Sequence, residues 1–206
     1  MNQWIILAYS TYTLSMMVVI SLYLKRKVGE HIIGRRKIPK DLIWISILGI
    51  IGTWIVILIP IIYIFYANIA DLTFRISIFQ NSIIEIIGTL LIVIGALLTT
   101  IAMIQLGKSA RVFIPNKDTN LITSGVYKFC RNPVYFGTYL SFIGTLFLVS
   151  SLLYLIGFCS FLIGMHIRIL QEEKFLTTRF GINYETYKNS IGRYLPKIHK
   201  SKNKNI

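Results

Sequence analysis

The hydrophobic positions of this chain are gathered into long runs separated by short polar segments. A helix needs about 20 apolar residues to cross the hydrocarbon core of a bilayer, and the runs 3–24, 42–67 and 83–106 qualify. A fourth run, 134–170, is interrupted near Ser150 and predicts two shorter helices that form a hairpin. The pattern predicts an all-α integral membrane protein with about five transmembrane helices, a C-terminal helical hairpin and a cytoplasmic tail.

Two polar segments flank the predicted hairpin, one before it in residues 107–133 and one after it from Arg168 onwards. Because a hairpin returns the chain to the side of the membrane from which it came, we expect these segments to meet and to enclose one ligand. We therefore divide the chain into three N-terminal transmembrane helices with a basic loop (1–106), a candidate catalytic region (107–196) and a basic, disordered tail (197–206).

Composition and charge support a membrane protein with a defined orientation. Of the 206 residues, 54% are hydrophobic, and the mean hydropathy of +0.64 is too high for an ordinary soluble domain. The net charge is +14, yet the loop 68–82 holds Arg75 as its single Lys or Arg. This alternation predicts an outside N-terminus and a cytoplasmic C-terminus, with both polar segments in the cytoplasm. The basic residues can attract anionic lipids, and nucleic-acid binding is not expected because no recognition module accompanies them.

Small residues recur at helical spacing in the predicted spans and indicate close helix packing. Within the run 83–106 they are Gly88, Gly95, Ala96 and Thr99. In the hairpin, one helix carries Gly137, Ser141, Gly144 and Thr145, and the other carries Gly157, Ser160 and Gly164. We expect the two hairpin helices to be tightly apposed through these residues, which would fix the relation between their cytoplasmic ends.

Capping signals place the ends of the predicted helices. Asn132 and Pro133 are typical of an N-cap followed by proline at the first helical position. Ser124-Gly125 indicates a turn before them, and Gly181 is placed to end the long helix that follows the hairpin turn. Residues 183–190 predict one further short helix, which bears Tyr184 and Tyr187.

Charged side chains near the inner end of the fifth span are the main candidates for chemistry. Arg168 and Glu172 are four residues apart and share a helix face, so they form either an ion pair at the membrane interface or part of a functional site. His166, seven residues before Glu173, is expected to pack or to hydrogen-bond a neighbouring helix. Four tyrosines near the polar segments indicate either an interfacial belt or contacts to a ligand: Tyr127, Tyr135, Tyr184 and Tyr187.

Other familiar chemistries have no signature in the sequence. Cys130 and Cys159 are expected to be free thiols, and no ligand spacing predicts a metal site. A glycine-rich dinucleotide or phosphate loop is also absent from the sequence.

Two motifs resemble a known family. TSGVYKFCRNPVYFG resembles the T-x-G-x-Y-x-x-x-R-H-P-x-Y-x-G segment of the isoprenylcysteine carboxyl methyltransferase and phospholipid methyltransferase superfamily of integral membrane methyltransferases. RILQEEKFLTTRFGINYETYKNSIGRYLP is similar to the R-x-x-x-E-E-x-x-L…F-G-x-x-Y-x-x-Y…P tail of that superfamily. The resemblance covers about residues 106–196. One departure is Asn132, which stands where the family usually has histidine and cannot carry a proton at neutral pH.

The resemblance implies a cytoplasmic site for S-adenosyl-L-methionine (SAM) formed by the loop and the helix after the hairpin. Arg168 is then expected to face the substrate, and Arg131 is the second candidate catalytic residue. Glu173 is expected to support the site or to provide an alternative contact. The cofactor contacts implied by the match are Thr119, Asn120, Leu121, Ile122, Tyr127, Asn132, Pro133, Val134, Tyr135, Glu172 and Glu173.

The expected function is therefore SAM-dependent methyl transfer to a membrane-associated acceptor, which the sequence leaves open as a carboxylate, a thiol or a lipid amine. Methyl transfer is an in-line displacement that depends mainly on alignment, and Arg168 is suited to neutralise an anionic acceptor. Two alternatives are an NADPH-dependent reductase of membrane lipids or sterols and a non-catalytic protein of the same fold. The composition, rich in Ile, Lys and Asn, favours a prokaryotic cell membrane, with the endoplasmic reticulum as the eukaryotic alternative.

Overall fold

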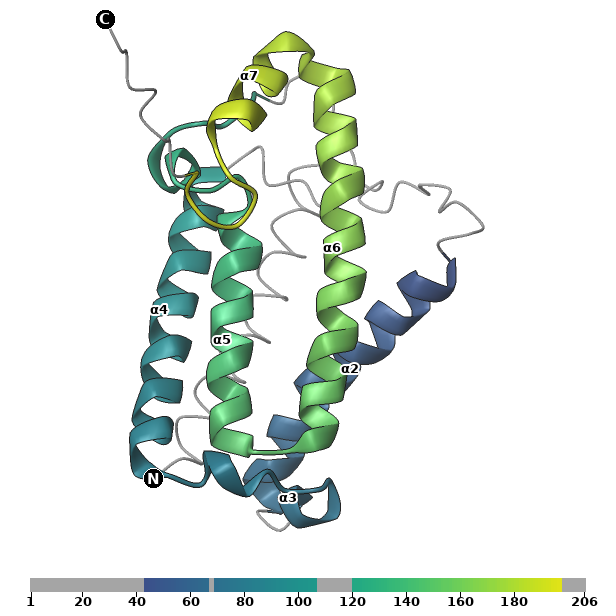
Figure 1. The fold of residues 1–206 in the computed structure, drawn as a ribbon, viewed down its shortest axis with the longest axis vertical. Helices are drawn as coiled ribbons and strands as arrows, with labels where there is room; N and C mark the ends of the chain where they lie inside the picture. The colour runs from purple at the N-terminus through teal and green to yellow at the C-terminus, as the bar shows by residue number, and fades with distance from the viewer. Residues whose placement is uncertain (1–42, 67–68, 107–119, 198–206) are drawn as a thin grey trace, which may run out of the picture.

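The computed structural model describes residues 43–66, 69–106 and 120–197, and the first predicted span, Thr119 and most of the basic tail lie outside them. The long elements are α2 (Ile43–Phe65), α4 (Ser82–Leu106), α5 (Pro133–Val149) and α6 (Leu152–Phe180) (Figure 1). Helices α2, α4 and α6 are long and apolar enough to cross a membrane, whereas α5 has 17 residues. The predicted helical architecture is confirmed for these ranges, where β structure is limited to two isolated bridges.

Short elements complete the described chain. They are α3 (Ile69–Leu72), the 3-10 helices η2 (Ser77–Phe79) and η4 (Gly125–Lys128), and α7 (Ile182–Ser190). The predicted helix over 183–190 is confirmed as α7. Gly181 ends α6 with a φ of +54°, a conformation that side-chain-bearing residues rarely adopt.

The four long helices pack as two close pairs, α4 with α5 and α2 with α6. In the first pair, a Cβ on Gly137 would lie 2.7 Å from the carbonyl oxygen of Gly95. In the second, a Cβ on Gly49 would lie 2.8 Å from the Cα of Gly164. Glycine is therefore required at both crossings, because only its missing side chain lets the backbones approach so closely.

The expectation that the small residues of the hairpin face one another is wrong. Those of α5 face α4, and those of α6 face α2. Large rings fill the space between α5 and α6, where Phe142 lies 5.0 Å from Phe161 and 6.3 Å from Phe158 between ring centroids. Tyr154 adds a hydrogen bond, since its hydroxyl donates to the carbonyl of Phe142 at 3.2 Å. Each hairpin helix thus uses its small face for a neighbour outside the hairpin and its aromatic face for its partner.

The hairpin turn is fixed by hydrogen bonds to the segment after α3. Ser150 adopts a φ of +53°, and its carbonyl accepts a hydrogen bond from the amide of Ile76 at 2.7 Å. The hydroxyl of Ser151 donates to Thr73 Oγ1 at 2.8 Å and accepts from the amide of Tyr154 at 3.2 Å. Ser151 thereby caps α6 and closes one end of the helical bundle.

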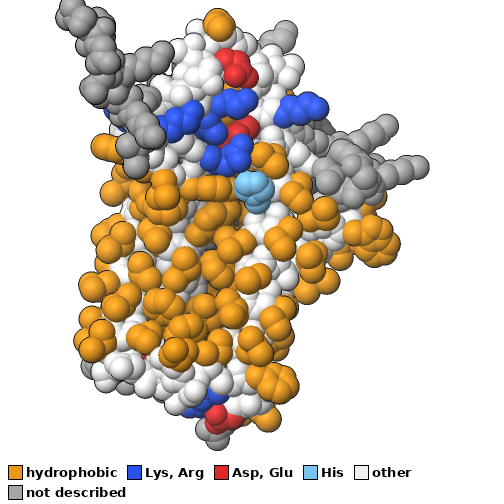
Figure 2. All heavy atoms as spheres, in the orientation of Figure 1, with side chains coloured by type: hydrophobic (Ala, Val, Ile, Leu, Met, Phe, Trp, Pro, Cys, Tyr) orange, Lys and Arg blue, Asp and Glu red, His pale blue; other side chains and the backbone are white. Residues whose placement is uncertain are grey.

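Hydrophobic and charged side chains are separated along the molecule. Figure 2 shows an apolar surface over the length of the helices, with charged side chains gathered at the two ends. At the α3 end, the charged residues of the described ranges are Asp71, Arg75 and Glu85. The other charged residues of those ranges lie in the C-terminal half of α6 and in the segments around α7 and η4, so most of the charged side chains gather at one end.

Candidate functional site

The chain after α7 returns across the polar ends of the helices (Figure 1). The amide of Arg131 donates to the carbonyl of Gly192 at 2.9 Å, and the amide of Asn132 donates to the carbonyl of Arg193 at 3.1 Å. These bonds hold residues 191–197, which we call the return segment, against the loop that leads into α5. The two polar segments predicted to meet at one end of the hairpin therefore do so.

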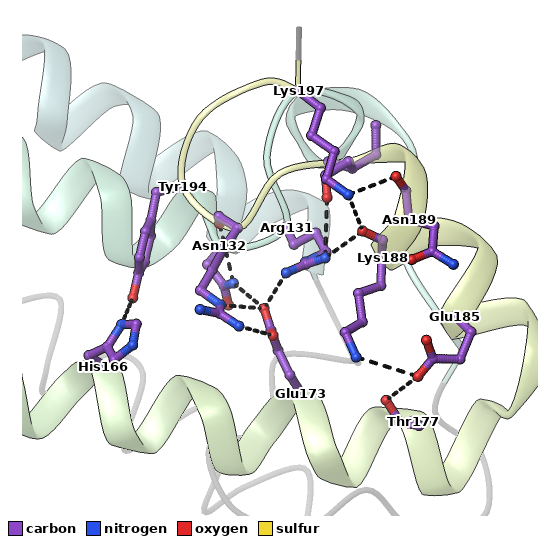
Figure 3. A network of polar contacts seen from close by, with 12 residues as sticks. Arg131, Asn132, His166, Glu173, Thr177, Glu185, Lys188, Asn189, Tyr194 and Lys197 are labelled. Atoms are coloured by element: carbon purple, nitrogen blue, oxygen red, sulfur yellow. Dashed lines mark hydrogen bonds and ion pairs between the residues drawn. The ribbon is translucent and has the colours of Figure 1, made fainter. Parts of the chain in front are cut away.

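A buried cluster of charges joins this segment to α6. Glu173 is 5% exposed, and its Oε1 accepts hydrogen bonds from Arg131 Nη2 at 2.9 Å and Arg193 Nε at 3.0 Å (Figure 3). Its Oε2 accepts from Arg193 Nη2 at 2.8 Å. The side-chain amide of Asn132, through Nδ2, lies 3.4 Å from Oε1. We call these four residues the Glu173 cluster. One carboxylate thus ties three parts of the chain together.

Both terminal nitrogens of the Arg131 guanidinium are hydrogen-bonded. In addition to Glu173, Arg131 Nη1 donates to the carbonyls of Lys188 at 2.7 Å and Ile191 at 3.2 Å. Its side chain is 7% exposed. Removing one partner of a buried ion pair typically lowers the free energy of unfolding by about 3–5 kcal/mol. Arg131, which the sequence predicted as catalytic, therefore stabilises the fold.

Asn132 occupies the N-cap position of α5, with Pro133 next to it, as predicted. Its side chain does not cap the helix. It donates instead to the carbonyl of Arg193 at 3.3 Å and approaches Glu173. The amide at this position, where the family usually has histidine, therefore contributes to attachment of the return segment.

A second polar group lies one residue away on α6 and is more accessible. The hydroxyl of Tyr135 donates to Glu172, at 2.9 Å from Oε1 and 3.1 Å from Oε2. Arg168 Nε lies 3.4 Å from Glu172 Oε1. The Arg168 and Glu172 side chains are 31% and 32% exposed, against 6% for Glu173. This Glu172 group, made of Tyr135, Arg168 and Glu172, confirms the predicted pairing on one helix face.

Tyr127 lies apart from both groups, in the contact between η4 and α7. Its hydroxyl donates to the carbonyl of Ala102 at 3.3 Å, and its carbonyl accepts from the hydroxyl of Tyr187 at 2.7 Å. Burial, and then the neighbouring Tyr187 and Cys130, raise the pKa of Tyr127 well above its ordinary value, which keeps its phenol protonated. Tyr184 and Tyr187 are also buried, with ring centroids 6.1 Å apart, so both tyrosines of α7 serve packing.

A glycine fixes the start of η4. Gly125 has a φ of +60°, and the amide of Val126 donates to Gln105 Oε1 at 2.9 Å. Before this turn, Asn120 is exposed while Leu121 and Ile122 are half-buried. Pro133 and Val134 form the first turn of α5 and precede Tyr135 of the Glu172 group.

Two residues of the return segment were missed by sequence reasoning. Arg193 completes the Glu173 cluster, and the hydroxyl of Tyr194 shares a 2.8 Å hydrogen bond with His166 Nδ1 (Figure 3). His166 was expected to pack or to hydrogen-bond a neighbouring helix, and its hydrogen bond goes instead to the return segment. Arg193 lies in a tail rich in lysine, and the sequence gives no signal that sets it apart from the other cations.

The arrangement presents a carboxylate beside a guanidinium at the boundary between the apolar surface and the polar end. Such a pair can accept hydrogen bonds from hydroxyl or ammonium groups and can neutralise an anionic group. Over the ranges that the structure describes, no set of three His, Cys, Asp or Glu side chains is placed to hold a metal ion.

Comparison with known proteins shows a similarity to methyltransferases. The family model for phospholipid methyltransferase matches residues 83–183. A protein-S-isoprenylcysteine O-methyltransferase from Schizosaccharomyces pombe is 31% identical over 134 residues, which cover 62% of this chain and 53% of that protein. The protein of that name from Saccharomyces cerevisiae is 36% identical over 117 residues, which cover 55% of this chain and 49% of that protein.

The Xenopus laevis protein of the same name is 32% identical over 123 residues, which cover 58% of this chain and 43% of that protein. This chain therefore spans about half the length of these curated relatives. The residues matched by the family model include α4, the α5–α6 hairpin and every member of the Glu172 group. Residues 83–183 therefore match the phospholipid methyltransferase family, and the chain is similar over a little more than half of its length to protein-S-isoprenylcysteine O-methyltransferases.

Proposed function

We propose that the chain is a SAM-dependent methyltransferase that acts on a membrane-associated acceptor, and specifically on the carboxylate of an isoprenylated cysteine or a chemically similar amphiphile. The observation that carries this proposal is the Glu172 group, a partly exposed Tyr135–Glu172–Arg168 set at the junction of the apolar and polar surfaces. The names of the relatives support the same reaction, and they give no support to the alternative of a lipid or sterol reductase.

The chemistry of the Glu172 group fits SAM. SAM carries an ammonium group and ribose hydroxyls, which are donors, and the Glu172 carboxylate is an acceptor held in place by Tyr135 at 2.9 Å. When bound, SAM supplies an electrophilic methyl group on a sulfonium. Glu172 and Tyr135 would bind and orient it, with Asn120, Leu121, Ile122, Pro133 and Val134 as further proposed contacts, and with Thr119 proposed from the motif alone.

Arg168 is proposed to bind the acceptor. A carboxylate acceptor is already ionised at neutral pH and needs neutralisation and alignment rather than a general base. The guanidinium of Arg168, 31% exposed beside Glu172, can supply a charge-assisted hydrogen bond to such a group. This assignment also accommodates Asn132, because the reaction requires no proton transfer at that position.

Arg131, Asn132, Tyr127 and Glu173 are proposed as positioning residues. Arg131 and Asn132 bond Glu173 and the backbone of the C-terminal segments, while Tyr127 bonds Ala102 and Tyr187. We propose that these contacts hold the start of α5, and with it Tyr135, in register with Glu172 on α6. Their substitution would then affect the cofactor and the acceptor together.

We also propose the orientation and the number of spans. The Glu172 group would lie at the cytoplasmic face, where SAM is available, while the apolar part of the acceptor remains in the bilayer. From the hydropathy pattern we propose five spans, and from the distribution of Lys and Arg we propose an outside N-terminus.

Product analysis tests the proposed reaction. The purified full chain in lipid nanodiscs is incubated with methyl-labelled SAM and N-acetyl-S-farnesylcysteine, and the products are analysed by mass spectrometry. We expect a labelled methyl ester that releases methanol in base, and no product from nanodiscs that lack the protein. Label on sulfur or nitrogen of another probe would contradict the carboxylate assignment. Binding of SAM without methylation of carboxylate, thiol or amine probes would favour the non-catalytic alternative.

A further inference from the structure

We propose that Tyr194 is a specificity-determining residue that forms the wall of the acceptor site on its membrane side and sets the size of the apolar group that fits. The inference rests on the proposed function and deepens it, because it concerns the lipidic part of the acceptor. Its basis is the position of one aromatic ring, contributed by the return segment, between two helices that belong to the apolar part of the molecule.

Tyr194 bridges α5 and α6. Its ring centroid lies 5.7 Å from that of Tyr139 on α5, and its hydroxyl shares the 2.8 Å hydrogen bond with His166 on α6 (Figure 3). Tyr139 in turn lies 6.1 Å from Phe161 of α6 between ring centroids. The ring of Tyr194 therefore extends the aromatic contact between α5 and α6 towards the polar end, although it comes from a segment outside the hairpin.

The depth of this ring relative to the Glu172 group follows from helix geometry. Tyr139 is four residues further along α5 than Tyr135, and His166 is six residues before Glu172 on α6. At about 1.5 Å per residue, both partners of Tyr194 lie on the membrane side of the Tyr135–Glu172 hydrogen bond, by roughly 6 and 9 Å respectively. An acceptor whose reactive group reaches Arg168 while its hydrocarbon chain stays in the bilayer has to pass this level.

The position of Tyr194 is set by its neighbours in the chain. Arg193 is held by two hydrogen bonds to Glu173, and its carbonyl accepts the amide of Asn132 at 3.1 Å. His166 then fixes the hydroxyl end of Tyr194. A ring that is tied at its backbone and at its hydroxyl loses little further freedom when a ligand binds, so it can serve as a fixed wall.

Acceptors that differ in the length of the hydrocarbon chain test the inference. The full chain in nanodiscs is assayed with N-acetylcysteine carrying an S-farnesyl or an S-geranylgeranyl group, and kcat/KM is measured for both. We expect Tyr194→Ala to raise the ratio of kcat/KM for the geranylgeranyl acceptor to kcat/KM for the farnesyl acceptor by about ten-fold. A small difference in hydrocarbon length in an apolar site changes kcat/KM by about that factor. Tyr194→Trp is expected to lower the same ratio, and the KM for SAM is expected to stay within about two-fold.

Two further variants separate this wall from a general structural role. Tyr194→Phe keeps the ring and is expected to keep the ratio, and Leu195→Ala, at the exposed neighbouring position, is a matched control that should also keep it. An unchanged ratio in both Tyr194→Ala and Tyr194→Trp, with both acceptors affected equally, would overturn the inference while the methyltransferase function stands. A wild-type chain that binds no SAM and methylates neither acceptor would overturn the proposed function and this inference with it.

Discussion

At the scale of single residues, two consecutive glutamates on α6 have different surroundings. Glu173 is buried between Arg131 and Arg193, whereas Glu172 is about one-third exposed and bonded to Tyr135. A carboxylate with both oxygens committed to arginines has little capacity for a ligand. We therefore propose Glu172, and not Glu173, as the glutamate of this pair that binds the cofactor.

The first prediction concerns the hydroxyl of Tyr135. In Tyr135→Phe, the carboxylate of Glu172 loses a donor, and hydrogen bonds to charged groups contribute about 1.5–3 kcal/mol. We expect the affinity for SAM, measured by calorimetry, to fall by about ten-fold or more. In Glu172→Gln, the affinity for SAM is expected to fall at least as far. Tyr63→Phe on α2 serves as the matched control. Wild-type affinity in both site variants would remove Glu172 from the cofactor site.

The second prediction concerns Arg168. If its guanidinium binds the acceptor, Arg168→Ala should raise the KM for the acceptor by about ten-fold or more, the loss expected for a charge-assisted hydrogen bond. The KM for SAM should change much less. Steady-state kinetics in both substrates provide this comparison, with Arg75→Ala at the α3 end as the control. Equal rises in both KM values would instead assign Arg168 to a structural ion pair with Glu172.

At the scale of elements, the hairpin shows what a sequence can and cannot predict. The small residues at helical spacing correctly indicated close packing, and the Asn132-Pro133 and Gly181 signals correctly placed the helix ends. The partners of the small faces were predicted wrongly, because helical spacing shows which side of a helix is small and does not show which helix it meets. The close pairs α4–α5 and α2–α6 depend on contacts between segments far apart in the chain.

The third prediction tests the pair α2–α6. In Gly164→Val, the new side chain has to enter the crossing where the backbones of Gly49 and Gly164 approach each other. Overpacking of this kind typically costs about 1–3 kcal/mol, so the thermal midpoint in detergent should fall by several degrees. The neighbouring Ile163→Val, on the exposed face, should leave the midpoint almost unchanged. A midpoint equal to the wild type in Gly164→Val would contradict the close crossing.

The fourth prediction tests attachment of the return segment. Cys130 is buried beside Gly192, and burial, opposed by the amide of Asn132, raises the pKa of its thiol. A raised thiol pKa leaves less reactive thiolate at any pH below it. In a Cys159→Ser background, Cys130 should therefore react slowly with maleimide at pH 7.

Loss of the Arg193–Glu173 ion pair should change that reactivity. Because Arg193→Ala removes two hydrogen bonds that anchor the return segment, we expect labelling of Cys130 to accelerate by about ten-fold or more, as local opening becomes less costly. Leu195→Ala, at an exposed position of the same segment, is the matched control. Labelling at the wild-type rate in Arg193→Ala would show that the segment is held by other contacts.

At the scale of the whole molecule, hydropathy predicted the helices of the described residues, because membrane insertion depends on long apolar runs. The apolar runs that fall within the described residues became α2, α4 and the hairpin, and the polar segments met at one end of it. The division of roles within that end was beyond the sequence. Arg131 and Arg168 are both cations in matched motifs, and only the contacts show that Arg131 is enclosed by the Glu173 cluster while Arg168 stays accessible.

The described part of the chain therefore consists of an apolar bundle with a small polar group at one end and the return segment fixed across it. This organisation suits a reaction between a water-soluble methyl donor and an acceptor with a membrane-bound chain. The charged side chains of the Glu172 group are 31–32% exposed, which leaves them accessible to the proposed ligands.

The most direct test of this account is a calorimetric titration of the purified full chain with SAM and, in a parallel titration, with NADPH. The account predicts saturable binding of SAM at one site per chain, weakened by about ten-fold or more in Glu172→Gln, and no binding of NADPH. Binding of NADPH in place of SAM, or of neither ligand to a chain that is folded by its thermal transition, would contradict it.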